Sequence, residues 1–106
     1  MSRIAGPKKI AEAASSSAIT IMATKWRDSY GNTYHRVRIY LNGMLIATSG
    51  VEYGYGDVYM DTAADLLAES GVVPGATYPG LRDQIADAGY VLVEEDEGYV
   101  KRKKDL

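Results

Sequence analysis

The dipeptide Asn42-Gly43 lies between two segments in which apolar and polar residues alternate. Asn-Gly readily takes positive φ at both central positions, as a type I′ hairpin turn requires. The sequence therefore predicts two antiparallel strands joined by a two-residue loop. In the register that this loop sets, Ile39 lies opposite Ile46. One face of this hairpin then carries the core residues Val37, Ile39, Leu41 and Ile46.

The segments around the hairpin predict an α+β fold. Residues 18–26 alternate like a further strand. After the hairpin, apolar residues at helical spacing predict a helix over 58–70, with Asp57 as its N-cap and Gly71 just past its end. The inward stripe of that helix consists of Met60, Ala63, Ala64 and Leu67. We expect a three-stranded antiparallel meander with this main helix on one face.

The remaining segments complete the expected domain. Residues 81–89 predict a short second helix, and a C-terminal strand begins at residue 90. Two paths stay open after residue 93: the strand continues across the acidic run, or it folds back near Gly98. The basic ending "KRKKDL" is expected to be solvated.

Length and composition favour one domain. The 106 residues suit a single core, which we assign to residues 17–106, after a flexible N-terminal arm at 1–16. The absence of cysteine excludes disulfides and thiolate chemistry and fits the cytoplasm. No apolar run reaches the length of a membrane span, so no membrane partner is expected.

The stretch "EYGYGD" at residues 52–57 connects the meander to the main helix. Its glycines allow a sharp turn, but turn chemistry does not require Tyr53 and Tyr55. The two rings are either lids over the end of the core or parts of a contact surface. The chain has nine Tyr, one Trp and no Phe, so every aromatic ring carries a polar atom.

Charge is strongly segregated along the chain. Residues 52–97 hold eleven acidic residues and one basic residue, whereas the segments on either side are basic. Four of the acids recur every four residues along the predicted helix, namely Asp57, Asp61, Asp65 and Glu69. Three interpretations stay open for this stripe: a solvated face, a contact with a basic partner, or a cation site. Because a helix spreads its side chains apart, we expect no metal and no cofactor.

A second candidate surface is basic and aromatic. It would use the alternating strand residues and the adjoining turn to stack bases and hold phosphates. Its members are Lys25, Trp26, Arg27, Arg36, Arg38 and Tyr40. Exposed Arg and Tyr also occur in strands simply because they stabilise sheets.

Two resemblances accompany these patterns. The segment "YHRVRIYLNG", followed by a strand, a Gly-containing loop and a helix, resembles the layout of a double-stranded RNA-binding domain. That family places a lysine cluster at the start of its last helix, where this chain has the acidic "GDVYMDTAADLL", so RNA binding is not carried over. The pattern "YGNTYH…NG…YGYGD…TA" is similar to small, functionally uncharacterised proteins of bacteriophages, which implies a viral, cytoplasmic accessory protein.

These observations lead to a functional expectation. His35 is the only histidine, and no nucleophile motif or phosphate loop accompanies it, so we expect no enzyme. We expect a phage accessory protein that binds, and inhibits, a host protein or ribonucleoprotein complex, as an anti-CRISPR protein does. The expected contact residues are Tyr53, Tyr55, Asp57, Asp61, Asp65 and Glu69. The alternative is a nucleic-acid-binding protein, and a homodimer also stays open.

Overall fold

The computed structural model of the protein describes residues 2–6, 10, 18–54 and 56–106, apart from the side chain of Asp57. The strands are β1 (Arg3–Ile4), β2 (Ala18–Arg27), β3 (Thr33–Leu41), β4 (Met44–Thr48), β5 (Glu52–Tyr53) and β6 (Val91–Val100). The helices are the 3-10 turn η1 (Gly56–Val58), α2 (Tyr59–Ser70), α3 (Leu81–Asp87) and the 3-10 turn η2 (Lys103–Asp105).

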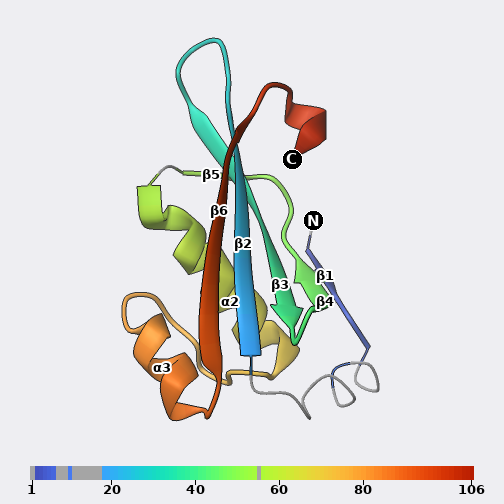
Figure 1. Ribbon diagram of the computed structural model, residues 1–106. Helices are drawn as coiled ribbons and strands as arrows, with labels where there is room; N and C mark the ends of the chain where they lie inside the picture. The colour runs from blue at the N-terminus through green and yellow to red at the C-terminus, as the bar shows by residue number, and fades with distance from the viewer. Residues whose placement is uncertain (1, 7–9, 11–17, 55) are drawn as a thin grey trace.

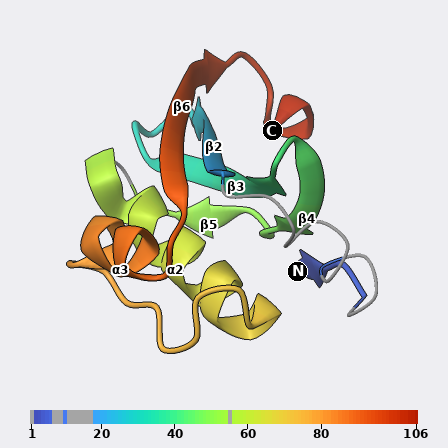
Figure 2. The ribbon, with the colours of Figure 1, turned by 60° about the horizontal axis from the view of Figure 1, so that its bottom comes forward.

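The strands form one sheet in the order β1-β4-β3-β2-β6, with β5 paired to β3 beyond the end of β4. Strands β2, β3 and β4 form an antiparallel meander, so the expected α+β class is confirmed. After α2 and α3 the chain returns as β6, which pairs parallel to β2 and continues across the acidic run. Both helices lie on one side of the sheet (Figures 1 and 2).

The core lies between the sheet and α2. Alternate residues of β2 and β3 point toward the helix and are fully buried, whereas the residues between them are half-buried on the opposite side. The stripe predicted for α2 is buried, and Leu66 and Tyr59 join it. From α3, Leu81 and Ile85 are buried, but Ala88 is exposed because the helix ends at Asp87.

The predicted hairpin turn is confirmed, and its register is corrected. Asn42 and Gly43 have φ values of 49° and 81°, and the four predicted core residues are buried. However, Ile39 lies opposite Ala47 rather than Ile46, because a β-bulge follows the pair Tyr40–Leu45. The bulge turns both Ile46 and Ala47 toward the helix, a shift that alternation alone does not predict.

The start of α2 differs from the prediction. The N-cap position belongs to Val58, which has helical φ and ψ and no side-chain cap. The prediction of Asp57 as the N-cap residue is therefore wrong, because the chain first passes through η1. At the other end Gly71 has φ of 77° and closes the helix as predicted.

The N-terminal segment contributes one short strand. Arg3 and Ile4 pair with Thr48 and Ala47 at the edge formed by β4. Residues 7–9 and 11–17 of the expected arm and its boundary lie outside the described residues. Within the described part of the chain, no helix has the length and apolar character needed to cross a membrane.

Candidate binding surfaces

The loop between β5 and α2 is fixed to the sheet by His35. The Gly54 amide donates to the Thr33 carbonyl at 2.9 Å, and His35 Nδ1 lies 3.3 Å from the Gly54 carbonyl oxygen. On its other side, His35 Nε2 lies 2.7 Å from Thr62 Oγ1 on α2. A proton on Nδ1 satisfies both contacts, because Nδ1 then donates to the carbonyl and Nε2 accepts from the hydroxyl. Burial lowers the pKa of His35, although Gly54 and Glu52 partly oppose this effect.

Gly54 is required where the loop passes over the start of the helix. Its φ is +144°, and an added Cβ would overlap Val58 Cγ1. Both the backbone angle and the lack of space exclude a larger residue there. The glycines of this loop therefore have the structural role that the sequence suggests.

Tyr53 is exposed and does not cover the end of the core. Its side chain is 61% exposed, and its ring meets that of Tyr34 edge-on with centroids 5.5 Å apart. Tyr34 in turn lies 5.5 Å from Trp26, so three rings form a row across β2, β3 and β5. Tyr55 lies outside the described residues, and its predicted role stays a prediction.

The acidic stripe occupies the outer side of α2. Asp61, Asp65 and Glu69 are exposed. None of the three has a side-chain hydrogen bond or ion pair to any other described residue. The backbone of Asp57 lies in η1, immediately before this stripe. The described members of the predicted contact set therefore lie on two sides of the sheet: Tyr53 shares the side of Tyr34, away from the helices, and the chain crosses at Gly54 to the acids of α2.

Other acids are neutralised inside the fold. Lys25 Nζ donates to Asp96 at 2.9 Å, and Arg82 forms a bidentate pair with Glu94 at 2.7 and 2.8 Å. The hydrogen bond from Lys25 lowers the pKa of Asp96, and the one from Arg82 lowers that of Glu94. These pairs join β6 to β2 and α3, so the chain's basic groups stabilise the edge strand instead of the stripe on α2.

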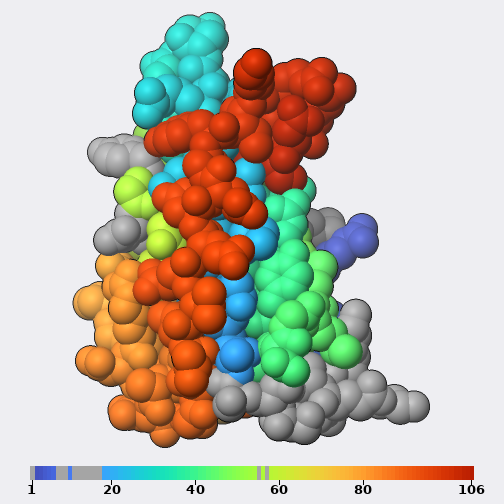
Figure 3. Space-filling model, in the orientation of Figure 1, coloured from blue at the N-terminus to red at the C-terminus, as the bar shows by residue number. Residues whose placement is uncertain are grey.

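The predicted basic and aromatic surface is divided between two sides of the sheet. Trp26, Arg36, Arg38 and Tyr40 lie on the side away from the helices, which we call the open face. Figure 3 shows the molecule from this side. Lys25 and Arg27 alternate to the helix side. Lys25 lies 5.5 Å from the ring centroid of Tyr59, and Arg27 lies 4.9 Å from that of Tyr99. The six residues therefore do not form one continuous surface.

The C-terminal segment folds back onto the open face. Residues 101–105 are exposed, but Leu106 is only 4% exposed. Its main-chain oxygen accepts hydrogen bonds from Arg36 and Arg38, both at 3.1 Å. The expectation of a solvated ending is wrong at this last residue. A leucine after five charged residues was the only signal in the sequence for this contact.

The described residues offer little for catalysis or metal binding. They contain no group of three or more His, Asp or Glu side chains placed to hold a metal ion. The His35–Thr62 pair resembles a base beside a hydroxyl nucleophile, but His35 is 1% exposed and is held between sheet and helix. The pair fits a structural tie between β3, the loop and α2.

Two exposed surfaces therefore remain available. One is the acidic outer side of α2, and the other is the open face, which carries Tyr53 at β5 and the folded-back C-terminal segment. Comparisons with protein-family models, with curated proteins and with solved structures yield no match to this chain.

Proposed function

We propose that the protein is a non-enzymatic binding protein that docks on a partner protein through Tyr53 and the outer side of α2. The observation that carries this proposal is the exposed acidic side of α2, which the described part of the chain leaves without a basic partner. Like charges at i, i+4 are unfavourable by themselves, and a basic partner surface would relieve them.

Tyr53 supplies the aromatic centre that such a surface needs. The ring projects from β5 with 61% of its area exposed, and Tyr34 supports it from one side. Binding hot spots centre on well-supported aromatic residues, and the rim of an interface is polar. Tyr53 is such an aromatic residue, and a partner that reaches around the edge formed by β5 would also contact the carboxylates of α2.

The finer proposal concerns the partner. The resemblance to bacteriophage proteins supports a host protein or ribonucleoprotein complex in the bacterial cytoplasm, which binding would inhibit in the manner of an anti-CRISPR protein. An interference assay tests this part. Expression of the chain should raise phage plaque counts in cells with an active CRISPR system, and the Tyr53→Ala variant should not.

Site-specific crosslinking tests the docking surface. A photoreactive phenylalanine analogue at position 53 should give a discrete protein adduct in bacterial lysate, and the same analogue at Tyr30 should not. Tyr30 is a matched control because it is 89% exposed at the tip of the β2–β3 turn. Equal adducts from both positions would contradict the proposal.

Charge reversal sharpens the same experiment. The double variant Asp61→Lys/Asp65→Lys should remove the adduct at position 53. The matched variant Asp83→Lys/Asp87→Lys changes the charge equally on α3 and should leave it intact.

Nucleic-acid binding through the open face is the second candidate. Trp26 and Tyr34 stack beside Arg36 there, and exposed basic residues of the C-terminal segment lie nearby. A gel-shift titration with single-stranded RNA tests it, since such binding should weaken steeply as salt rises. Crosslinked adducts that nuclease removes would favour this candidate.

A further inference from the structure

Two arginines converge on one acceptor on the open face. Arg36 and Arg38 alternate with buried residues along β3, so both guanidinium groups point away from α2. Nη1 of Arg36 and Nη2 of Arg38 each lie 3.1 Å from the main-chain oxygen of Leu106. Neighbouring guanidinium groups that share an acceptor repel one another unless negative charge lies between them.

No acidic side chain supplies that charge within the described part of the chain. The ion pairs there join Lys25 to Asp96, Arg82 to Glu94, and Arg102 to Asp105. Glu95 shares the cross-strand row of Arg38, but Met22 on β2 stands between them. The acceptor that the two guanidinium groups share is therefore the main-chain oxygen of Leu106, and no described carboxylate side chain pairs with either of them.

The hydrogen-bonding capacity of the pair is also incompletely used. Arg36 Nε is buried and has no hydrogen-bond partner among the described residues. Arg38 makes one further contact, a long one of 3.5 Å to Thr24 Oγ1. A guanidinium group has five N–H donors, so the pair retains donors for the oxygens of an oxyanion beside Leu106.

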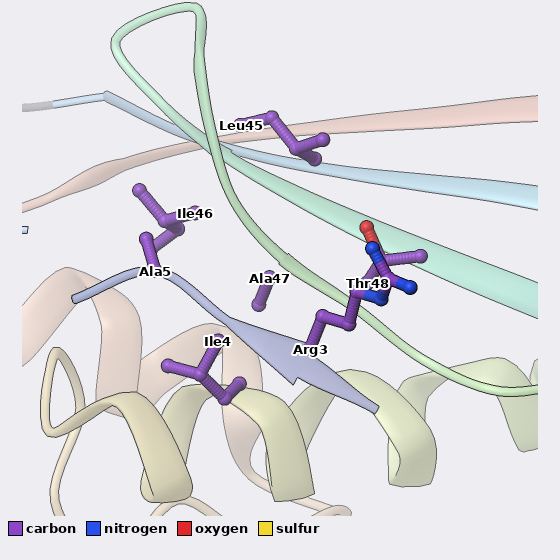
Figure 4. Close-up of a pocket in the computed structure, with 7 residues that line it drawn as sticks. All are labelled: Arg3, Ile4, Ala5, Leu45, Ile46, Ala47 and Thr48. Carbon is purple, nitrogen blue, oxygen red and sulfur yellow. The ribbon is translucent and has the colours of Figure 1, made fainter. Parts of the chain in front are cut away.

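A hollow lies beside the pair. Its volume is about 510 Å³, and it is lined by Arg3, Arg36, Leu45, Thr48 and Ser49. A smaller hollow of about 200 Å³ lies between β1 and β4, with Arg3 and Thr48 on its wall (Figure 4). Because Arg3 pairs with Thr48 and Thr48 with Arg38, these three residues form one row across β1, β4 and β3.

We propose that Arg36 and Arg38, together with Arg3 and the hydroxyl of Thr48, form a binding site for an oxyanion, either a phosphate or a carboxylate group. Guanidinium groups match the geometry of both anions through paired hydrogen bonds. This site lies on the open face across β1, β4 and β3, whereas Tyr53 lies on the same face at β5. Leu106 occupies its edge, so ligand binding competes with the docked C-terminal segment.

Nuclear magnetic resonance of the full chain tests the site. Inorganic phosphate and acetate are titrated separately, each at constant ionic strength against chloride. The reporters are the backbone amides of Thr48 and Leu106 and the side-chain Nε–H of Arg36. We expect saturable chemical-shift changes at all three N–H groups with phosphate, with acetate or with both. The probe that binds more tightly shows whether the site prefers a phosphate or a carboxylate group.

Lysine substitutions separate geometry from charge. Arg38→Lys keeps the charge but removes the planar donor pair, and it should weaken binding about tenfold or more. Arg3→Ala should also weaken binding, and because Arg3 is exposed, this variant remains informative if substitution of Arg36 disturbs the fold. Arg82→Lys, on the helix side, is the matched control and should bind as the parent chain does.

Three results would overturn the proposal. Shifts that chloride reproduces would show only ionic-strength effects. Shifts confined to residues 101–104 would show diffuse attraction to the basic segment. Saturable shifts that neither Arg38→Lys nor Arg3→Ala weakens would place the anion elsewhere.

Discussion

The two faces of the sheet are built from the same strands but differ in chemistry. On the helix side, Ile21 and Ile39 are fully buried beneath α2. On the open face, which Figure 3 shows from the front, their neighbours Met22 and Arg38 stay half-buried on the side away from α2 and α3. Alternation along a strand therefore places a dense apolar core and a cationic, partly aromatic surface one residue apart.

This contrast separates stability from function. Beneath α2 the helix side is mainly apolar and excludes water, and its buried polar residues His35 and Lys25 are held by hydrogen bonds. The open face has arginines, hydroxyl groups and a leucine of the chain's own C-terminal segment, which are groups that bind other molecules. Substitutions on the two faces should therefore differ in the property they change.

The largest effect is expected in the core. Ile21→Ala should lower the free energy of unfolding by about 2–5 kcal/mol, because it removes buried methylene groups and leaves a cavity. Met22→Ala, one residue along on the open face, should cost about 1 kcal/mol or less because Met22 is already partly solvated. Denaturant titrations measure both values. Equal losses would mean that the open face is sealed as tightly as the core.

Gly54, where the chain passes from one face of the sheet to the other, should be the position next most sensitive to substitution. Gly54→Ala should cost about 1–3 kcal/mol, since the new Cβ meets Val58 and the backbone keeps positive φ. Gly31→Ala is the matched control: Gly31 also has positive φ, but its Cβ would meet nothing, so about 1 kcal/mol is expected.

A second substitution separates the two causes. Val58→Ala in the Gly54→Ala background removes the crowding atoms and should recover part of the loss measured by thermal unfolding. No recovery would mean that backbone strain alone determines the cost.

Local patterns predicted much of this architecture. Alternation and the Asn-Gly pair predicted the meander and its buried face, and helical spacing predicted the stripe of α2. Each signal lies within a few residues of the structure it specifies. The bulge at Ile46 escaped prediction because it depends on how β4 packs against α2, not on the hairpin sequence.

The functional surfaces were only partly predictable. Alternation could have shown that Lys25 and Arg27 leave the open face, since both are odd-numbered in a strand whose odd positions are buried. The parallel pairing of β6 with β2 and the return of Leu106 to Arg36 join residues 70 or more positions apart. Contacts at that separation depend on the whole topology and leave no local pattern.

Acidic pH should lower the free energy of unfolding through the protonation of His35. Burial lowers its pKa from the ordinary 6.5, so the unfolded chain binds this proton more readily than the folded chain does. The stabilising effect of neutral His35 is complete above about pH 6.5 and is lost as pH falls toward the lowered pKa. Unfolding free energy, measured by urea titration, should therefore decrease between pH 7 and pH 5.

The variant His35→Gln isolates this contribution. In this variant the free energy of unfolding should depend less on pH between pH 7 and pH 5, whatever the stability of the variant at pH 7. Glu94 and Asp96 do not interfere, because their pKa values are lowered from 4.5 and 3.8 and their protonation belongs to more acidic conditions. An unchanged slope in the variant would assign the effect to another group.

The smallest effect is expected on the acidic side of α2, where stability and binding should move in opposite directions. Asp65 has an acid four residues away on either side, so Asp65→Asn should stabilise the chain by about 0.2–0.5 kcal/mol for each repulsion removed. Asp61→Asn should be nearly neutral, because Asp61 lies in the first turn, where the helix dipole favours a negative charge. Thermal unfolding at low salt resolves the two variants, and 1 M salt should abolish their difference since it screens exposed charges. If these carboxylates contact a basic partner, both variants should also reduce the crosslinked adduct at position 53. A variant that gains stability and keeps the full adduct would mean that this side of α2 is only a solvated surface.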